Sequence, residues 1–279
     1  MIKDAATANQ HQFWRDPSLP FIEARAVQDG RRVCYEKHSH PQFSIGAITG
    51  GHSTYINQRQ QQLACRGTLV LMNPEEVHAC NPIDDQPWSY LMFYVDNDWL
   101  QQQQEEAGLG THFRPFDTTA SRDPYLYQGL CRLYRQLALS LPEPMAREEA
   151  CYRFFRLLLG RLTPAQWDDR PPAHLERAAE LIRDEYTRPV TLAELAKVAG
   201  ITPSHLVRSF ARHYGMTPHA YLLDRRIRHA KQLLRRDTPL AEVALGCGFA
   251  DQAHFQHHFK RRVATTPGCY RQSLTTPTR

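Results

Sequence analysis

Residues 191–221 read TLAELAKVAGITPSHLVRSFARHYGMTPHAY, and the spacing of their large side chains returns later in the chain. Four residues recur 49 positions further on: Leu206, Phe210, Pro218 and Tyr221 return as Phe255, Phe259, Pro267 and Tyr270. Both copies lie in segments whose pattern predicts a helix, a tight turn and a second helix. Two helix-turn-helix units in tandem favour binding to double-stranded DNA.

The first copy carries the local signals of two capped helices. Thr191 is followed three residues on by Glu194, which is the pairing of a capping box. Gly200 ends this run because a left-handed backbone costs least at glycine. Thr202, which precedes a proline, is suited to begin the next helix. We therefore predict the first helix-turn-helix unit at about 191–213.

The second copy follows the same plan. Thr238 and Pro239 repeat the cap pattern, Gly248 marks the turn and Asp251 is suited to cap the second helix. We therefore predict the second unit at about 239–262.

A single long helix is predicted between the units, from Pro218 to Arg236, because apolar residues follow one helical stripe there. Nineteen residues at 1.5 Å each would span about 28 Å. Successive major grooves on one side of a duplex lie about 34 Å apart, so one chain could reach two of them.

Charge is divided unequally along the chain. Residues 174–279 hold 17 Lys and Arg against 9 Asp and Glu, a net charge of +8, whereas the first 173 residues carry −3. The excess positive charge thus lies in the part that would neutralise phosphates. Any single arginine of the long helix could equally belong to its solvated face.

The region from about Leu175 to Tyr270 resembles the AraC/XylS transcription regulators. The matching residues are Val243-Ala244, Gly248-Phe249, Phe255, Phe259-Lys260, Thr266-Pro267 and Tyr270-Arg271. One departure is Ala264, where the family usually has glycine after the second recognition helix, and alanine tolerates a left-handed C-cap less well.

The resemblance implies which residues meet DNA. The base-reading positions that it implies are Ser204, Val207, Arg208, Gln252, Ala253, Gln256 and His257. Three further predicted DNA-binding residues, His205, Arg212 and Lys260, lie on the outward faces that the helical spacing leaves to the same two helices. Arg208 can present a fork to guanine, and Gln252 can pair with adenine. Leu206, Phe210, Phe255 and Phe259 are instead predicted to be core residues.

The N-terminal half has a different pattern, with short alternating stretches at 31–37, 43–48, 53–56, 68–72 and 88–95 separated by turn residues. This pattern predicts a small all-β barrel or jelly roll. It is similar to the cupin-type sensing domain that precedes the DNA-binding half in this family. Helices predicted at 97–107, 123–139 and 144–162 either form a dimer surface, as the family implies, or only cover the barrel.

Histidines are prominent in this half. His38, His40 and His78 could approach one another, but metal-binding cupins usually add a glutamate a few residues after the first pair, and Gln42, Phe43 occupy that stretch. We therefore predict no metal and no other cofactor. The candidate effector-binding residues are His38, His40, Tyr55, His78, Trp88 and Tyr90, for a small molecule such as an amino acid or another polar metabolite.

Location follows from absent signals. The chain has no apolar run long enough to cross a bilayer, and its first residues lack a signal-peptide core. Seven cysteines without a CxxC pair fit reduced thiols. We therefore expect a cytoplasmic protein without a membrane partner.

The predicted fold class is α+β: a cupin-like β-barrel with trailing helices at 1–162, a linker at 163–173, and an all-α domain at 174–279 with two helix-turn-helix motifs joined by a long helix. The predicted function is that of a ligand-responsive transcription regulator, not an enzyme, that acts as an activator and a homodimer, with RNA polymerase as a further candidate partner. The alternatives are a metal-dependent cupin enzyme fused to a nucleic-acid-targeting module, and a barrel that serves only for oligomerisation.

Overall fold

The N-terminal half of the computed structural model is built from two antiparallel sheets. The structure describes residues 11–275 apart from 32–34, 59, 141–142, 163, 165–170 and 237. The larger sheet has the strand order β1-β2-β8-β3-β6-β9, and the smaller has the order β5-β4-β7. The strands are β1 (His11–Trp14), β2 (Ile22–Val27), β3 (Phe43–Gly50), β4 (His52–Asn57), β5 (Gln60–Cys65), β6 (Leu69–Met72), β7 (His78–Pro82), β8 (Ser89–Val95) and β9 (Ala120–Ser121).

Strand β6 shows how one sheet serves two cores. Leu69 and Leu71 pack in a cluster shared with the trailing helices, whereas Val70 and Met72 pack in a cluster inside the barrel. Successive side chains of a strand point to opposite faces, so a strand covered on both sides is apolar throughout. The interior cluster also includes Tyr55 and Cys80 from the smaller sheet.

The strand pattern predicted from the sequence is incomplete. Four expected strands are present as β3, β4, β6 and β8. The strand expected at 31–37 is not formed at residues 35–37, and residues 32–34 lie outside the described residues. The sequence did not indicate β5, which begins Gln60-Gln61-Gln62, because an edge strand need not carry an apolar face.

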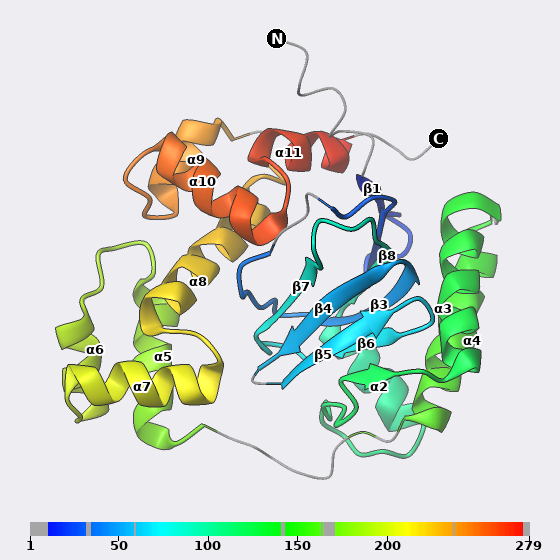
Figure 1. Ribbon diagram of the computed structural model, residues 1–279, viewed down its shortest axis with the longest axis horizontal. Coiled ribbons are helices and arrows are strands. Elements are labelled where there is room, and N and C mark those ends of the chain that lie inside the picture. The colour runs from blue at the N-terminus through cyan, green and yellow to red at the C-terminus, as the bar shows by residue number, and fades with distance from the viewer. Residues whose placement is uncertain are drawn as a thin grey trace.

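The trailing helices are present close to their predicted bounds. They are α2 (Asn97–Glu106), α3 (Pro124–Arg135) with the short π-helix η1 (Gln136–Ser140) at its end, and α4 (Pro144–Arg161). Figure 1 shows α3 and α4 on one flank of the sheets and the C-terminal helices on the opposite side. Phe155 and Leu158 of α4 are fully buried against the cluster that includes Leu130 of α3.

The C-terminal part is all-α, so the α+β fold class is confirmed. Its helices are α5 (Ala173–Glu185), α6 (Leu192–Ala199), α7 (Pro203–Tyr214), α8 (Pro218–Leu233), α9 (Leu240–Gly246), α10 (Gln252–Val263) and α11 (Pro267–Thr275). Helix α8 runs between the α6–α7 unit and the α9–α10 unit (Figure 1). It contributes Tyr221 and Leu222 to the first core and Ile227 and Ala230 to the second.

Helix α8 is shorter than predicted. It ends at Leu233, and residues 234–236 form a turn, so its 16 residues span about 24 Å rather than 28 Å. The apolar stripe in the sequence extends to Leu234, which led to the longer prediction. Leu234 does pack into the second core, but it does so from the turn that follows the helix.

Most predicted caps are confirmed. Thr191 and Glu194 form the capping box, Gly200 ends α6 with φ of 70°, and Asp251 accepts from the backbone of α10. The cap predicted at Thr238 is wrong, because α9 is preceded directly by Pro239 and has no side-chain cap. Ala264 ends α10 in the left-handed conformation despite its methyl group.

Candidate DNA-binding surface and effector cavities

Helices α7 and α10 each begin at a side-chain cap that fixes their first turn. The hydroxyl of Thr202 accepts a hydrogen bond from the backbone N–H of His205 at 3.3 Å, and Asp251 accepts one from His254 at 2.7 Å. The buried faces are held by Leu206 and Phe210 in α7 and by two phenylalanines in α10. The predicted core role of these residues is confirmed.

The opposite faces of the two helices are open to solvent. Nine of the ten residues predicted to bind DNA are exposed and Val207 is half-buried: the nine are Ser204, His205, Arg208, Arg212, Gln252, Ala253, Gln256, His257 and Lys260. Exposed side chains in the first turns of such helices are suited to reach base edges in a major groove. Their role as contacts remains a prediction.

Three arginines near these helices are structural instead. Arg226 is buried and donates to the carbonyl oxygens of Tyr186 and Arg188 at 2.7 and 3.0 Å. Arg228 bonds to groups of the barrel, and Arg262 is buried beside Glu36. From the sequence alone, an arginine of this kind could either contact DNA or lie on a solvated helix face. The contacts above show a third role, because these arginines bond to other groups of the protein.

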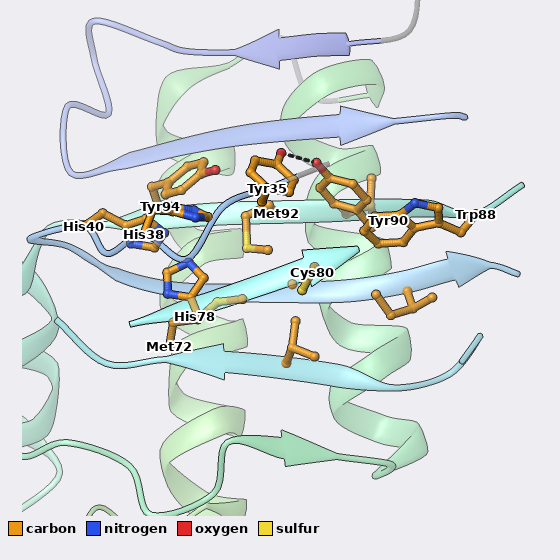
Figure 2. Close-up of a pocket in the computed structure, with 14 residues that line it drawn as sticks. Tyr35, His38, His40, Met72, His78, Cys80, Trp88, Tyr90, Met92 and Tyr94 are labelled. Atoms are coloured by element: carbon orange, nitrogen blue, oxygen red, sulfur yellow. Dashed lines mark hydrogen bonds between the residues drawn. The ribbon is translucent and has the colours of Figure 1, made fainter. Parts of the chain in front are cut away.

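The barrel encloses a small cavity. Its volume is about 30 Å³, where one water molecule needs about 10–15 Å³ on the same measure, whereas sites for small organic molecules measure about 300–1,000 Å³. Both sheets contribute to the wall, with Tyr90 and Met92 from one and His78 and Cys80 from the other (Figure 2). The interior can hold a water molecule or an ion without rearrangement, but not a metabolite.

Three imidazoles gather at one end of this cavity (Figure 2). The ring centroids of His38 and His40 each lie close to that of His78, at 4.5 Å in both cases. His38 and His40 do not share the face of one strand, because His38 forms only an isolated bridge with His78 and His40 has no strand pairing in the described part of the chain. Burial lowers the pKa of His38 to about 4 and that of His78 to about 3, and it also lowers the pKa of His40.

The other predicted effector residues are bonded to the barrel itself. The Tyr55 hydroxyl donates to the carbonyl oxygen of Leu71 at 2.6 Å, and Tyr55 does not line the cavity. Trp88 donates from Nε1 to the Gly30 carbonyl oxygen at 2.8 Å. The hydroxyl oxygens of Tyr90 and Tyr35 are 2.7 Å apart.

A larger cavity lies between the barrel and the C-terminal helices. It measures about 440 Å³, which is the size of a site for a small metabolite. The barrel contributes Arg25 and Tyr94, and α8 contributes Lys231 to the wall. His38 and His40 line both cavities.

Lys231 is the distinctive residue of this wall. Its ammonium group forms no ion pair with a carboxylate in the described part of the chain, and it lies 5.8 Å from the centroid of the Tyr270 ring. Burial lowers the pKa of Lys231 to about 8. A lysine held this way is suited to an anionic partner, because such a partner would restore the favourable interactions lost with water.

Polar contacts join the barrel directly to α8 and α10. Arg228 pairs with Asp224 at 3.0 Å on its own helix and with Glu75 of the barrel at 2.7 Å. Glu36 of the barrel pairs with Arg261 at 2.5 Å and with Arg262 at 3.0 Å. These contacts, which sequence reasoning missed, place barrel residues that lie two or three positions before His38 and His78 against the DNA-binding half.

A small β sensing barrel followed by two linked helix-turn-helix units defines a ligand-responsive transcription regulator. Residues 22–155 match the model of the AraC-like ligand binding domain, and residues 195–273 match that of a helix-turn-helix domain. The chain belongs to the AraC/XylS family of transcription regulators, and it binds DNA sequence-specifically under the control of a small molecule.

Curated proteins that are similar to most of this chain are named as transcriptional regulators. The uncharacterized HTH-type transcriptional regulator YbfI of Bacillus subtilis is 27% identical over 245 residues, 86% of this chain and 87% of its own. The HTH-type transcriptional activator RhaS of an Enterobacter species is 22% identical over 260 residues, 90% of this chain and 91% of its own.

The fold is shared with a solved regulator. An apo variant of ToxT from Vibrio cholerae matches with a TM-score of 0.56 and 12% identity, covering 91% of this chain and 98% of that one. No helix in the described ranges is both long and apolar enough to span a bilayer.

Proposed function

We propose that this regulator responds to a small anionic metabolite that binds between its barrel and its DNA-binding half. The observation that carries this proposal is the 440 Å³ cavity, whose wall includes Lys231, which forms no ion pair with any carboxylate that the structure describes. The barrel interior, at about 30 Å³, is too small for the same ligand. The role of the cavity is binding and not catalysis.

The electrostatics of the wall favour an acid over a neutral ligand. Glu23 is engaged by Arg15 and Arg235, and Asp224 by Arg228, so the nearby carboxylates already have cationic partners. Glu23 and Asp224 also act favourably on Lys231 through space, but neither forms an ion pair with it in the described part of the chain, so its ammonium group can pair with a ligand anion. ToxT has been crystallised with an unsaturated fatty acid and with a substituted butenoic acid, both of which are carboxylic acids.

Of the predicted effector residues, His38 and His40 are the two that the ligand would touch, because they line the larger cavity. His78, Trp88 and Tyr90 line only the interior cavity, and Tyr55 lines neither. We therefore propose His38, His40 and Lys231 as effector contacts, with Tyr94 beside them.

A ligand in this position would control DNA binding through the relative placement of the two halves. It touches both, so its affinity differs between arrangements in which the cavity is closed or open. DNA binding by α7 and α10 also differs between these arrangements, and the two equilibria are therefore linked. Arg208 would read guanine and Gln252 adenine in successive grooves.

We propose activation as the outcome, with RNA polymerase as a partner and the cytoplasm as the site of action, because RhaS relatives are named transcriptional activators. Residues 1–162 would sense and dimerise, and residues 174–279 would bind DNA. Of the linker at 163–173, residues 163 and 165–170 lie outside the described residues.

The outer face of α3 and α4 is the proposed dimer surface. It carries exposed large apolar side chains, with Tyr125 and Met145 exposed by 63% and 69%. Tyr125 is in the first turn of α3 and Met145 in the first turn of α4, so the two mark opposite ends of this surface. Exposed apolar area along such a face favours association. Sedimentation of the full wild-type chain should show a dimer. Met145→Glu should dissociate it, whereas Met145→Gln, which adds no charge, should remain mostly dimeric. A monomeric wild-type chain would remove this part of the proposal.

The decisive test is selection of duplexes bound by the full chain from random DNA, followed by affinity measurements with a library of carboxylic acids and matched amides. We expect an enriched site with two half-sites about one helical turn apart and at least one acid that changes the affinity by about 5- to 150-fold. Lys231→Met should remove the response to the acid but keep the selected site. An amide that acts as well as its acid would contradict the anionic ligand.

A further inference from the structure

We propose that His38, His40 and His78 form a binding site for a divalent first-row transition-metal ion. One ring nitrogen of each residue can be chosen so that all three lie within 4.8 Å of one another. A tetrahedral ion bound at about 2.0–2.1 Å needs nitrogens roughly 3.3 Å apart, so small rotations of the side chains complete the site. His40 and His78 are buried, and no carboxylate is required.

The backbone already fixes two of the ligands relative to each other. The N–H of His38 donates to the carbonyl oxygen of His78 at 3.1 Å, and the N–H of His78 donates back at 2.9 Å. This antiparallel bridge joins segments 40 residues apart and sets their side chains next to each other. Figure 2 shows the imidazoles of His38 and His78 facing the same end of the cavity as His40.

Hydrogen bonds to the backbone determine which ring nitrogen of His38 and His78 is available to an ion. Nδ1 of His38 lies 2.9 Å from the carbonyl oxygen of Glu36, and Nδ1 of His78 lies 2.9 Å from that of Glu76. A carbonyl oxygen only accepts, so both Nδ1 atoms carry the proton and both Nε2 atoms carry a lone pair. This is the arrangement by which proteins orient histidine ligands of metals.

His40 follows the same plan with a second partner. Its Nδ1 lies 3.3 Å from the carbonyl oxygen of Gln42 and 3.1 Å from the hydroxyl oxygen of Ser44. Nδ1 is therefore occupied by its own chain, which leaves Nε2 for an ion. Lone pairs gathered in a buried site repel unless a cation or a water molecule lies among them.

The size of the cavity and the chemistry of the ligands restrict which ions can bind. The adjoining cavity of about 30 Å³ admits an ion with one water molecule as its fourth ligand, and three histidines with a water are a known zinc arrangement. The absent glutamate after His40 is thus not an obstacle. Imidazole suits zinc, nickel, copper and iron, whereas magnesium and calcium prefer oxygen. Of the nearby cations, Arg228 and Arg262 are paired with carboxylates, and Lys231, which acts on His38 and His40 as well, has its pKa lowered by burial to about 8.

Such an ion would hold a segment that the DNA-binding half also contacts. Residues 36–40 span two of the ligands, and within them Glu36 pairs with Arg262 of α10 while Ser39 donates to Asp224 of α8. Ordering this segment would therefore favour one placement of α8 and α10. The metal site itself does not depend on the proposed anionic effector.

The test uses the full chain, stripped with a chelator and then incubated with Co²⁺ or Zn²⁺. After desalting, we expect about one ion per chain by elemental analysis, visible Co²⁺ bands typical of low coordination, and a raised Tm. His78→Gln and His38→Gln should each lose most of the bound ion and the Tm shift. His52→Gln is the matched control, because His52 is exposed on β4 of the same barrel.

The two variants are used together because a buried residue such as His78 could be needed for folding. His38 is half-buried, so His38→Gln should leave the deeper packing intact. A folded His38→Gln chain that keeps the wild-type stoichiometry would overturn the site, and so would a wild-type chain that retains no ion after desalting. Neither readout uses DNA or an effector, so failure here is distinguishable from failure of the proposed function.

Discussion

Ser39 of the barrel donates a hydrogen bond of 2.9 Å from its hydroxyl to Oδ2 of Asp224, although the two residues are 185 positions apart. The same hydroxyl accepts from Arg228, which pairs with Glu75 as well. Both Ser39 and Asp224 are buried. Ser39 lies between His38 and His40, so the bond links the histidine cluster to the helix that joins the two DNA-binding units.

Ser39→Ala should weaken communication between the halves. The variant leaves Asp224 buried with one partner fewer, at a cost of about 1–3 kcal/mol in the free energy of unfolding. The docked arrangement is then less favoured, so the ratio of DNA affinities with and without effector should move toward one. Ser53→Ala is the control, because the buried Ser53 hydroxyl has no hydrogen-bond partner among the described residues and its removal should be neutral or stabilising. Equal effects of the two variants would contradict this role of Ser39.

Arg208→Ala should reduce specific DNA binding by about 1–3 kcal/mol and relax the base preference at one position of the site. The reason is the loss of a fork that can donate to guanine. Competition binding with duplexes substituted at single positions measures both effects. Arg132→Ala, an exposed arginine on α3, removes the same charge far from the proposed surface and should leave both unchanged. Retained preference in the Arg208 variant would exclude it as a base reader.

Lys260→Ala should act differently, by weakening every sequence alike. Lys260 lies in the last turn of α10 and is exposed, which suits a phosphate contact. Removal of one phosphate contact should lower the slope of log affinity against log salt by about one. Titrations of selected and random duplexes over a range of salt concentrations measure this slope. A loss confined to the selected site would instead assign Lys260 to base recognition.

The pH dependence of effector binding should follow Lys231. Burial lowers its pKa to about 8, and a bound anion favours the protonated form. While the acid itself is ionised, its affinity should thus be constant up to about pH 8. It should fall by up to tenfold per pH unit above that, where unliganded Lys231 loses its proton, and level off above the higher pKa of Lys231 in the bound state. Lys231→Arg keeps its charge, so its calorimetric titrations should give a flat profile across this range. A wild-type affinity that does not change with pH across this range would show that Lys231 does not bind the ligand.

The two helix-turn-helix units could be predicted from the sequence because their signals are local. The capping box of Thr191 and the buried positions of Phe210 and Phe255 depend on spacings within a few helical turns. The barrel was predicted less completely, since edge strands such as β5 carry no apolar alternation.

The interface and the histidine geometry could not be predicted in this way. The pairing of Glu36 with Arg262 and of Ser39 with Asp224 joins residues that no local pattern relates. The orientation of His38 depends on a hydrogen bond to the carbonyl oxygen of Glu36, which no residue type encodes. An arginine in the sequence therefore looks the same whether it meets phosphate or, like Arg228, a buried aspartate.

Ala264→Gly should stabilise the second DNA-binding unit. Ala264 ends α10 with φ of 56°, a left-handed backbone that costs an L-residue about 1–2 kcal/mol and glycine almost nothing. The greater freedom of glycine in the unfolded chain offsets part of this gain, so we expect a net increase of about 0.5–1 kcal/mol. Gly200→Ala is the matched control: Gly200 has φ of 70° with open space around it, so an added methyl meets only the backbone cost and should destabilise. Urea unfolding midpoints measure both variants. A lower midpoint for both would mean that contacts of the Ala264 methyl outweigh its backbone strain, because the two changes are otherwise opposite in sign.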